Sequence, residues 1–168
     1  LINNSTVTAT TVTAGVGGTT WVLKTPAEIR KDINDALTGI WNTTKQIAMP
    51  DTILLPPTKM AYLANTQNSA SSDVSLLEYI IKYNTYTMLT GKPLKIQALR
   101  QLVGAGASST DRMVVYRRSP DVVKMHIPMR LKFLPPERQI LRTVVPAIFR
   151  LGGVDVRLPS EITYWDGF

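Results

Sequence analysis

The stretch VVKMHIPMRLKFL at residues 122–134 has the clearest pattern in the sequence. Its odd positions from 123 to 133 are apolar, and its even positions include the basic residues Lys124, His126, Arg130 and Lys132. A period of two is typical of a β-strand whose side chains alternate between two faces. We therefore expect a strand with one packed face and one basic face. Pro128 cannot donate a backbone hydrogen bond, so it needs a sheet edge or a bulge.

The rest of the last third is also rich in β-strand patterns. RMVVYRR (112–118) and TVVPAIFRL (143–151) predict two further strands. The closing stretch 152–165 places Val154, Val156 and Leu158 on one face and Asp155 and Arg157 on the other. We expect this edge to pack, largely against other copies of the chain.

A long helix is predicted near the start of the chain. Thr25 suits the N-cap, Pro26 the first turn and Glu28 the return contact of a capping box. Apolar residues then recur at helical spacing: Ile29, Ile33, Ala36, Leu37, Ile40 and Trp41. The helix is expected to run from Thr25 to about Ala48, and the fold class is therefore α+β.

The middle of the chain predicts mixed structure. We expect a short buried strand at 53–55, a helix from Thr58 to Asn65, and a helix starting near Ser72 or Ser75. Gly91 and Pro93 end that helix, and a strand follows at 94–99. Residues 1–24 are rich in Thr, Val, Ala and Gly, so we expect an extended arm that needs a neighbour to become ordered.

Composition narrows the possible functions. The chain has 168 residues, a formal net charge of +7 and no cysteine. A basic balance favours polyanions or acidic surfaces as partners, and the lack of cysteine excludes disulfides and thiolate chemistry. No apolar run reaches the roughly 20 residues of a membrane helix. Because the first residue is Leu1, we expect a processed product or fragment with further sequence upstream.

No catalytic constellation is visible. His126 is the only histidine and has no acid near it in sequence, so a structural or surface role is favoured over a triad or a zinc site. The glycine-rich stretches 15–20 and 104–110 lack the Lys-Ser/Thr of a phosphate-binding loop. The carboxylates are scattered. We therefore expect no enzyme activity, no catalytic residues, no cofactor and no metal.

Arginine is concentrated in the last third. From Asp111 onward there are ten Lys or Arg, of which eight are Arg, and six Asp or Glu. Arginine pairs with carboxylates and phosphates through two parallel hydrogen bonds. Inter-strand ion pairs, salt bridges between subunits and contacts to DNA all remain open at this point.

The ordered set of these segments resembles the major capsid proteins of tailed bacteriophages, whose shell fold is shared with encapsulins. FRLGGVDVRLPSEITYWDG (149–167) and ILLPPTKMAYL (53–63) carry most of the resemblance, which covers nearly the whole chain. It implies a peripheral domain from residues 25–48 and 127–168, with the long helix as a spine on the strands. Residues 49–126 would form the axial domain, and residues 1–24 the end of an extended loop.

The resemblance implies a structural virion protein that self-assembles into an icosahedral shell around double-stranded DNA. Its partners would be copies of itself in hexamers and pentamers, non-specifically bound DNA, and decoration or scaffold proteins. It would assemble in the host cytoplasm, without a membrane. An encapsulin-type compartment and a basic nucleic-acid-binding domain are the alternatives. The residues expected at subunit interfaces or facing the lumen are Val16, Trp21, Leu23, Arg30, Lys31, Asp32, Asp35, Arg138, Arg142, Arg150 and Arg157.

Overall fold

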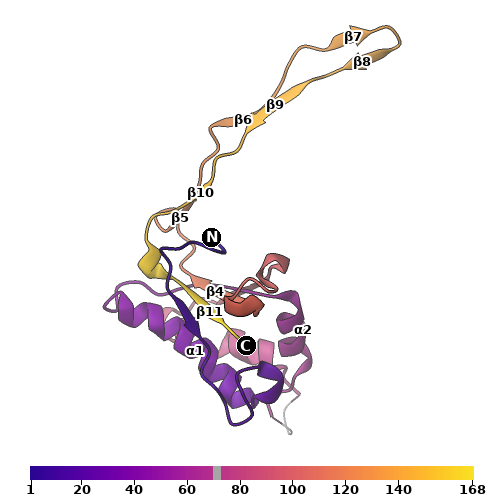
Figure 1. The fold of residues 1–168 in the computed structure, drawn as a ribbon. Coiled ribbons are helices and arrows are strands. Elements are labelled where there is room, and N and C mark those ends of the chain that lie inside the picture. The colour runs from indigo at the N-terminus through magenta and orange to yellow at the C-terminus, as the bar shows by residue number, and fades with distance from the viewer. Residues whose placement is uncertain (70–72) are drawn as a thin grey trace.

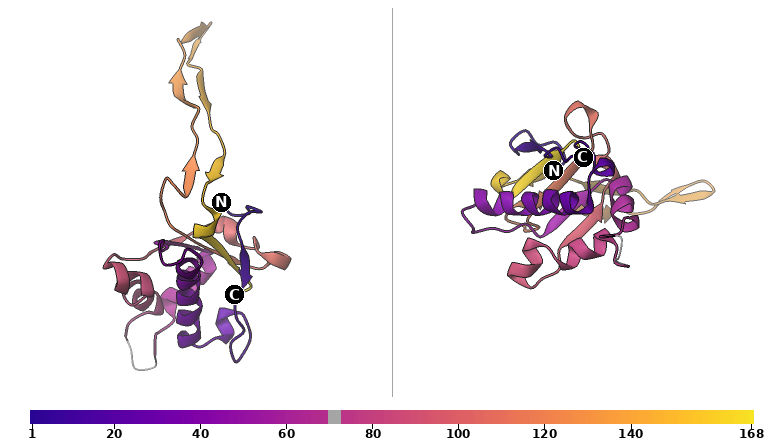
Figure 2. Two further views of the ribbon diagram at one scale, coloured as in Figure 1. Left: turned by 90° about the vertical axis from the view of Figure 1, so that its left-hand side faces the viewer. Right: turned by 90° about the horizontal axis from the view of Figure 1, so that it is seen from below.

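A computed structural model describes residues 1–69 and 73–168 and shows a mixed α+β chain with two visibly different parts (Figure 1). Most of the chain forms a body in which helices pack on a β-sheet. Residues 123–156 leave this body and return to it as a long, narrow two-stranded extension, which we call the hairpin arm. The other two views show the same projection away from the body (Figure 2).

The body is built on a five-stranded sheet in the order β1-β11-β4-β2-β3. These strands are β1 (Ala9–Thr11), β11 (Ile162–Asp166), β4 (Arg112–Tyr116), β2 (Thr52–Leu55) and β3 (Lys95–Ala98). β1 runs parallel to β11 and β3 parallel to β2, whereas β4 is antiparallel to both of its neighbours. The central strands β2 and β4 are buried along their whole length, as expected for strands covered on both faces.

Alternate side chains along the central strands of the sheet belong to two separate cores. Ile53, Leu55 and Met113 belong to the core under the helices, whereas Leu54 and Val114 belong to the core on the opposite face. Successive side chains of a strand point to opposite faces, so apolar runs such as ILL and MVV supply both cores at once.

Helix α1 (Pro26–Thr43) begins as expected but ends earlier. Both hydrogen bonds of the Thr25–Glu28 capping box are present, and the predicted stripe is buried from Ile29 to Ile40. The expectation of a helix to Ala48 is wrong, because Lys45 and Gln46 have φ angles of 53° and 67°. A left-handed backbone at two consecutive residues cannot continue a right-handed helix.

The other helices are short. They are α2 (Pro57–Asn65), α3 (Leu76–Lys82) and α4 (Thr85–Thr90). Ser75 caps α3 as expected, whereas the alternative start near Ser72 lies outside the described residues. The single helix expected there is divided, because Asn84 caps α4 by accepting a hydrogen bond from the Thr87 N–H. Within residues 1–69 and 73–168, four short 3-10 segments complete the helical structure: Trp21–Leu23, Arg100–Leu102, Ala107–Ser109 and Pro159–Glu161.

The N-terminal segment does not form the free arm that we expected for residues 1–24. Its strand β1 pairs with β11, and Val7, Val12 and Trp21 are buried against the chain's own body. The Trp21 ring lies 4.6 Å from that of Phe168. Although bulky apolar residues are few here, they reach existing cores, so the segment needs no neighbouring chain for these contacts.

The hairpin arm consists of three consecutive strand pairs. β5 (Val123–Met125) pairs with β10 (Val154–Val156), β6 (Met129–Phe133) with β9 (Ala147–Arg150), and β7 (Glu137–Gln139) with β8 (Arg142–Val144). Proline or glycine separates the pairs, and the stretch predicted as one strand at 122–134 is accordingly interrupted at Pro128. Gly152 suits the first break, because a Cβ there would lie 2.8 Å from the carbonyl oxygen of His126.

The division into peripheral and axial domains stays a prediction. In this structure β11 of the predicted peripheral domain pairs with β4 of the predicted axial domain, and α1 packs on the same core as β2. Of the strands expected beneath the long helix, β11 lies there, whereas β6 to β9 lie in the hairpin arm (Figure 1).

Candidate assembly surfaces

The hairpin arm has two chemically different faces. Ile127, Met129 and Leu131 come from one side of the hairpin, and Phe149 and Leu151 from the other; together they line a shallow hollow of about 320 Å³. We call these five residues the apolar face. Lys132 lies directly opposite Ile148 in the strand register, so these two side chains share the other face. The predicted alternation of apolar and basic positions holds at Lys132, but a break in register between Met129 and Lys132 places Arg150 opposite Met129.

The expectation that the apolar face is packed is wrong within this chain. Leu131, Phe149 and Leu151 are 58%, 59% and 59% exposed. The reason is the topology: the arm is only two strands wide and projects from the body, so no second layer of the same chain covers it (Figures 1 and 2).

The arm ends in an apolar tip. Ile140 and Leu141 connect β7 to β8 and are 102% and 98% exposed, and Ile140 has a φ angle of 49°. Predicted site residues Arg138 and Arg142 flank them, with a 3.4 Å hydrogen bond from Arg142 to Gln139 Oε1. The tip therefore exposes two large apolar side chains that nothing in the described part of the chain covers.

Charged groups gather at the base of the arm. Arg157 Nε lies 3.5 Å from Asp155 Oδ2, and His126 Nε2 lies 3.7 Å from the same oxygen. No acid lies near His126 in the sequence. Asp155 lies close to it in the structure because strand β10 pairs with β5. All three side chains are about half exposed, which fits a surface histidine better than a catalytic one.

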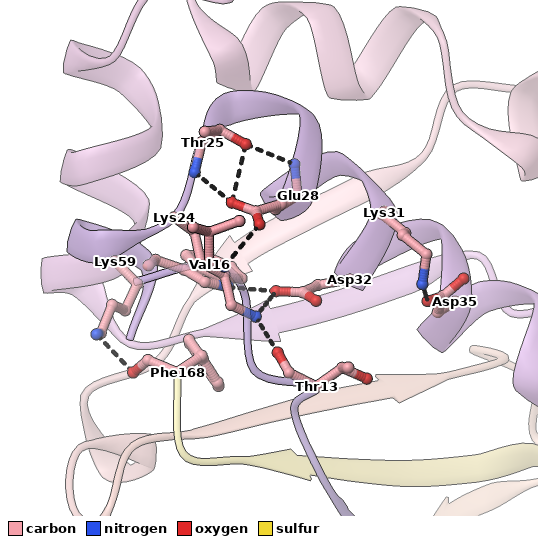
Figure 3. A network of polar contacts seen from close by, with 11 residues as sticks. Thr13, Val16, Lys24, Thr25, Glu28, Lys31, Asp32, Asp35, Lys59 and Phe168 are labelled. Carbon is pink, nitrogen blue, oxygen red and sulfur yellow. Dashed lines mark hydrogen bonds and ion pairs between the residues drawn. The ribbon is translucent and has the colours of Figure 1, made fainter. Parts of the chain in front are cut away.

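Two predicted site residues are internal to the subunit. Lys24 Nζ lies 2.6 Å from Asp32 Oδ2, with side chains 1% and 6% exposed (Figure 3). The indole N–H of Trp21 donates to the same oxygen. Burial raises the pKa of Asp32, and the hydrogen bond from Lys24 opposes that effect. Trp21 and Asp32 therefore stabilise the body rather than facing a neighbour or a lumen, which corrects our expectation for them.

The remaining predicted residues are spread over the surface. The N–H of Val16 donates to Glu28 Oε1 (Figure 3). Val16 is fully exposed, and Leu23 is 59% exposed. Lys31 and Asp35 form an exposed ion pair one helical turn apart. Arg30 lies over the Tyr79 ring, whereas Arg150 lies on β9 of the arm. The predicted residues thus fall into two main groups, one on α1 and one made of the arginines of the hairpin arm.

Sequence reasoning missed two ion pairs within the body. Arg112 donates to both carboxylate oxygens of Asp166 at 2.7 and 2.8 Å, and Arg117 pairs in the same way with Glu161. Both arginines lie on or directly after β4, and both acids lie on or directly before β11. Only the register of these strands brings them together. For these two arginines, the inter-strand ion pair is the correct alternative.

The Arg112–Asp166 pair predicts a specific dependence of stability on pH. Burial alone would raise the pKa of Asp166, but hydrogen bonds from Arg112 and the Ala107 N–H outweigh it and hold the pKa below its ordinary value of 3.8. A carboxyl group whose pKa is lower in the folded than in the unfolded state stabilises the fold at pH values above its unfolded-state pKa. This stabilisation is lost as pH falls through the folded-state pKa. In acid unfolding monitored by circular dichroism, the stability of Asp166→Asn should therefore fall less steeply below about pH 4 than the stability of the wild type. Equal slopes would contradict this.

The described residues carry no sign of a metal centre or a membrane span. Among residues 1–69 and 73–168, no three His, Cys, Asp or Glu side chains lie close enough to hold a metal ion. None of the helices in those ranges is long and apolar enough to cross a bilayer.

The comparison with known families decides the identity of the fold. A family model described as "Major capsid protein" matches residues 1–168, the whole chain. The chain belongs to the major capsid protein family. A search of curated proteins finds no match.

Solved structures agree with the family. The capsid of Myoviridae phage XM1 superimposes with a TM-score of 0.76 at 18% identity, covering 100% of this chain and 53% of that chain. A virus-like particle from Pyrococcus furiosus gives a TM-score of 0.59 at 15% identity, covering 97% and 57%. The α+β fold is therefore that of a phage capsid protein, and the chain spans about half the length of the two solved chains.

Proposed function

We propose that this capsid protein is a structural subunit whose copies assemble into a closed icosahedral shell, as hexamers and pentamers, in a virion. The match of the family model to all 168 residues carries this proposal. The hairpin arm supports it, because an exposed apolar face and an exposed apolar tip are typical of surfaces that become buried on association. A closed lattice is stable even when each contact is weak, since every subunit makes several contacts at once.

The shell is proposed to enclose double-stranded DNA, bound without sequence specificity, after assembly in the host cytoplasm with decoration or scaffold proteins as further partners. Six of the chain's Lys and Arg residues but only two acids lie between positions 123 and 156. A basic surface of this kind is attracted to phosphate in a salt-dependent way. We assign the subunit no catalytic role.

A protein-filled compartment is the second candidate, favoured by the likeness to the Pyrococcus furiosus virus-like particle. The two candidates differ in what the particles hold. Particles purified from the native source should be treated with nuclease, opened, and analysed for nucleic acid and for co-purifying protein. Protected double-stranded DNA supports the virion proposal, whereas a stoichiometric cargo protein without DNA supports the compartment.

Charge reversal in the arm and at its base is expected to impair assembly more than folding. Arg142→Glu and Arg157→Glu change exposed side chains outside both cores, so the thermal unfolding midpoint should stay within a few degrees of the wild type. Particle yield, measured by sedimentation, should fall several-fold, because an arginine that pairs with a neighbour is replaced by a repelling charge. Arg142→Lys keeps the charge and serves as the control. Normal yields from both glutamate variants would count against arginine-dependent contacts.

A further inference from the structure

We infer that the outer edge of strand β1 binds the same edge of a second copy, so that the two body sheets join into one. The inference rests on the proposed function, since it names a surface of the body through which copies of the shell subunit associate. The sheet ends in two edge strands, β1 and β3, so the assignment is a choice between defined alternatives.

The backbone of β1 is paired on one side only. The C=O of Thr8 and the N–H of Val12 each form a hydrogen bond with β11, at 3.1 and 3.0 Å, so the backbone groups of even-numbered residues face β11. Because the direction of these groups alternates along a strand, the N–H and C=O of Ala9 and Thr11 face the open edge of the sheet. A row of this kind is a template on which another strand can pair.

The β1 edge lacks the features that normally prevent strand pairing. Residues 1–23 contain no charged side chain, and residues 5–13 contain neither proline nor glycine. All three residues of β1 are exposed, and the segment around them is rich in Thr and Val, which favour strands. Uncharged segments of high β-propensity are the ones that add most readily to other strands.

The opposite edge of the sheet is protected. Strand β3 begins at Lys95, and Lys92 and Arg100 flank it with no Asp or Glu between them. Pro93 also lies just before the strand, and charged side chains and proline are the usual means of keeping an edge strand from pairing. Two copies that met through β3 would bring like charges together, whereas two copies that met through β1 would not.

A two-fold axis through Thr10 makes β1 complementary to itself. In antiparallel pairing about this axis, Ala9 lies opposite Thr11 of the second copy, and the outward N–H and C=O groups of these residues bind each other. Thr10 lies opposite its own counterpart, with about 4.5 Å between the Cα atoms, where threonine hydroxyl groups can form a hydrogen bond. This symmetry and the lack of charge on both partners favour a second copy as the occupant.

Exposed residues of the two edge strands provide a matched pair of variants. Thr10→Lys places two ammonium groups opposite each other across the proposed axis, whereas Gln97→Lys adds the same charge to β3. Thr11→Pro removes an outward N–H without adding charge, and the bonds of Thr8 and Val12 to β11 do not involve that group. Circular dichroism and tryptophan fluorescence confirm that each variant retains the wild-type fold before its association is measured.

The test is the oligomeric state of the 168-residue chain by light scattering over a range of concentrations. Thr10→Lys should weaken association by about ten-fold or more and Thr11→Pro several-fold, whereas Gln97→Lys should associate like the wild type. If Thr10→Lys and Thr11→Pro associate as well as the wild type, or if Gln97→Lys is weakened equally, the inference is overturned while the proposed function stands. A wild type that stays monomeric also overturns the inference, whereas the proposed function is judged separately from particles of the native source.

A second readout reports the register of the contact. The chain has no cysteine, so single cysteines can be introduced and oxidised with glutathione disulfide. Thr10→Cys should form disulfide-linked dimers faster than Ala9→Cys, because only position 10 lies opposite itself and a disulfide needs Cα atoms within about 7 Å. A mixture of Ala9→Cys and Thr11→Cys should yield the mixed dimer in preference to either homodimer. Dimers formed equally fast from all three positions, or preferentially from Ala9→Cys alone, would contradict the inference.

Discussion

Asp32→Ala is expected to lower the free energy of unfolding by about 3–5 kcal/mol, the range for removing one partner of a buried ion pair. Asp32 accepts hydrogen bonds from Lys24 Nζ at 2.6 Å and from the Trp21 indole at 3.2 Å. Without the carboxylate, the Lys24 ammonium stays buried and keeps only the Thr13 carbonyl oxygen as a partner. Urea unfolding followed by tryptophan fluorescence measures the change.

The control lies on the same helix. Asp35 also pairs with a lysine, Lys31, but both side chains are exposed to solvent. Asp35→Ala should therefore leave the urea midpoint nearly unchanged, because exposed ion pairs contribute little. Similar losses from the two variants would show that the buried position of Asp32 is not what makes it important.

Arg112→Ala is expected to have an effect of similar size, about 3–5 kcal/mol, because it too removes one partner of a buried ion pair. The guanidinium binds both oxygens of Asp166, donates to the Ile2 carbonyl and Asn3 Oδ1, and lies over the Tyr164 ring. Its removal leaves the buried Asp166 carboxylate with the Ala107 N–H and takes away two hydrogen bonds to residues 2 and 3. Urea unfolding again gives the magnitude.

Arg118 provides the comparison, because its side chain is exposed beyond the end of β4. Arg118→Ala should shift the unfolding midpoint only slightly. In addition, Arg112→Ala but not Arg118→Ala should increase hydrogen exchange of the N-terminal segment, since Arg112 donates hydrogen bonds to residues 2 and 3. Unchanged exchange there would contradict the role assigned to Arg112.

Local signals in the sequence were sufficient for most of the body. The Thr25–Glu28 capping box and the stripe from Ile29 to Ile40 depend only on residues a few positions apart, and both are confirmed. The strands at 52–55 and 112–116 were predictable for the same reason, because their apolar runs are short and bounded by turns. The end of α1 was not predictable, since two left-handed residues, Lys45 and Gln46, leave no clear pattern.

Features that depend on tertiary contacts could not be predicted. The N-terminal segment looked like a free arm because its apolar residues are sparse, yet Trp21 fits a core that residues 29–37 and Phe168 build. Period-two alternation in 122–134 showed that the strand has two faces, but not that it would leave the body. The pairing of Arg112 with Asp166 depends on strand register across 54 residues.

The candidate site residues also differ in how far their surroundings could be predicted from the sequence. Arg138, Arg142 and Arg150, selected for their charge and residue type, lie on exposed strands of the hairpin arm, and their place at an interface or lumen stays a prediction. The same reasoning failed for Asp32, because an aspartate beside Arg30 and Lys31 looks like a solvated surface residue until its burial is known. The apolar tip at Ile140 and Leu141 was missed, although two bulky residues between polar flanks are a signal that sequence inspection can find.

Electron microscopy of the protein recovered from its native source, unfixed and at moderate salt, tests the central claim most directly. If copies of this capsid protein build a shell, the micrographs will show closed, uniform particles tens of nanometres across. A preparation that contains only small, dispersed monomers, with no particles at any stage of purification, would contradict the claim.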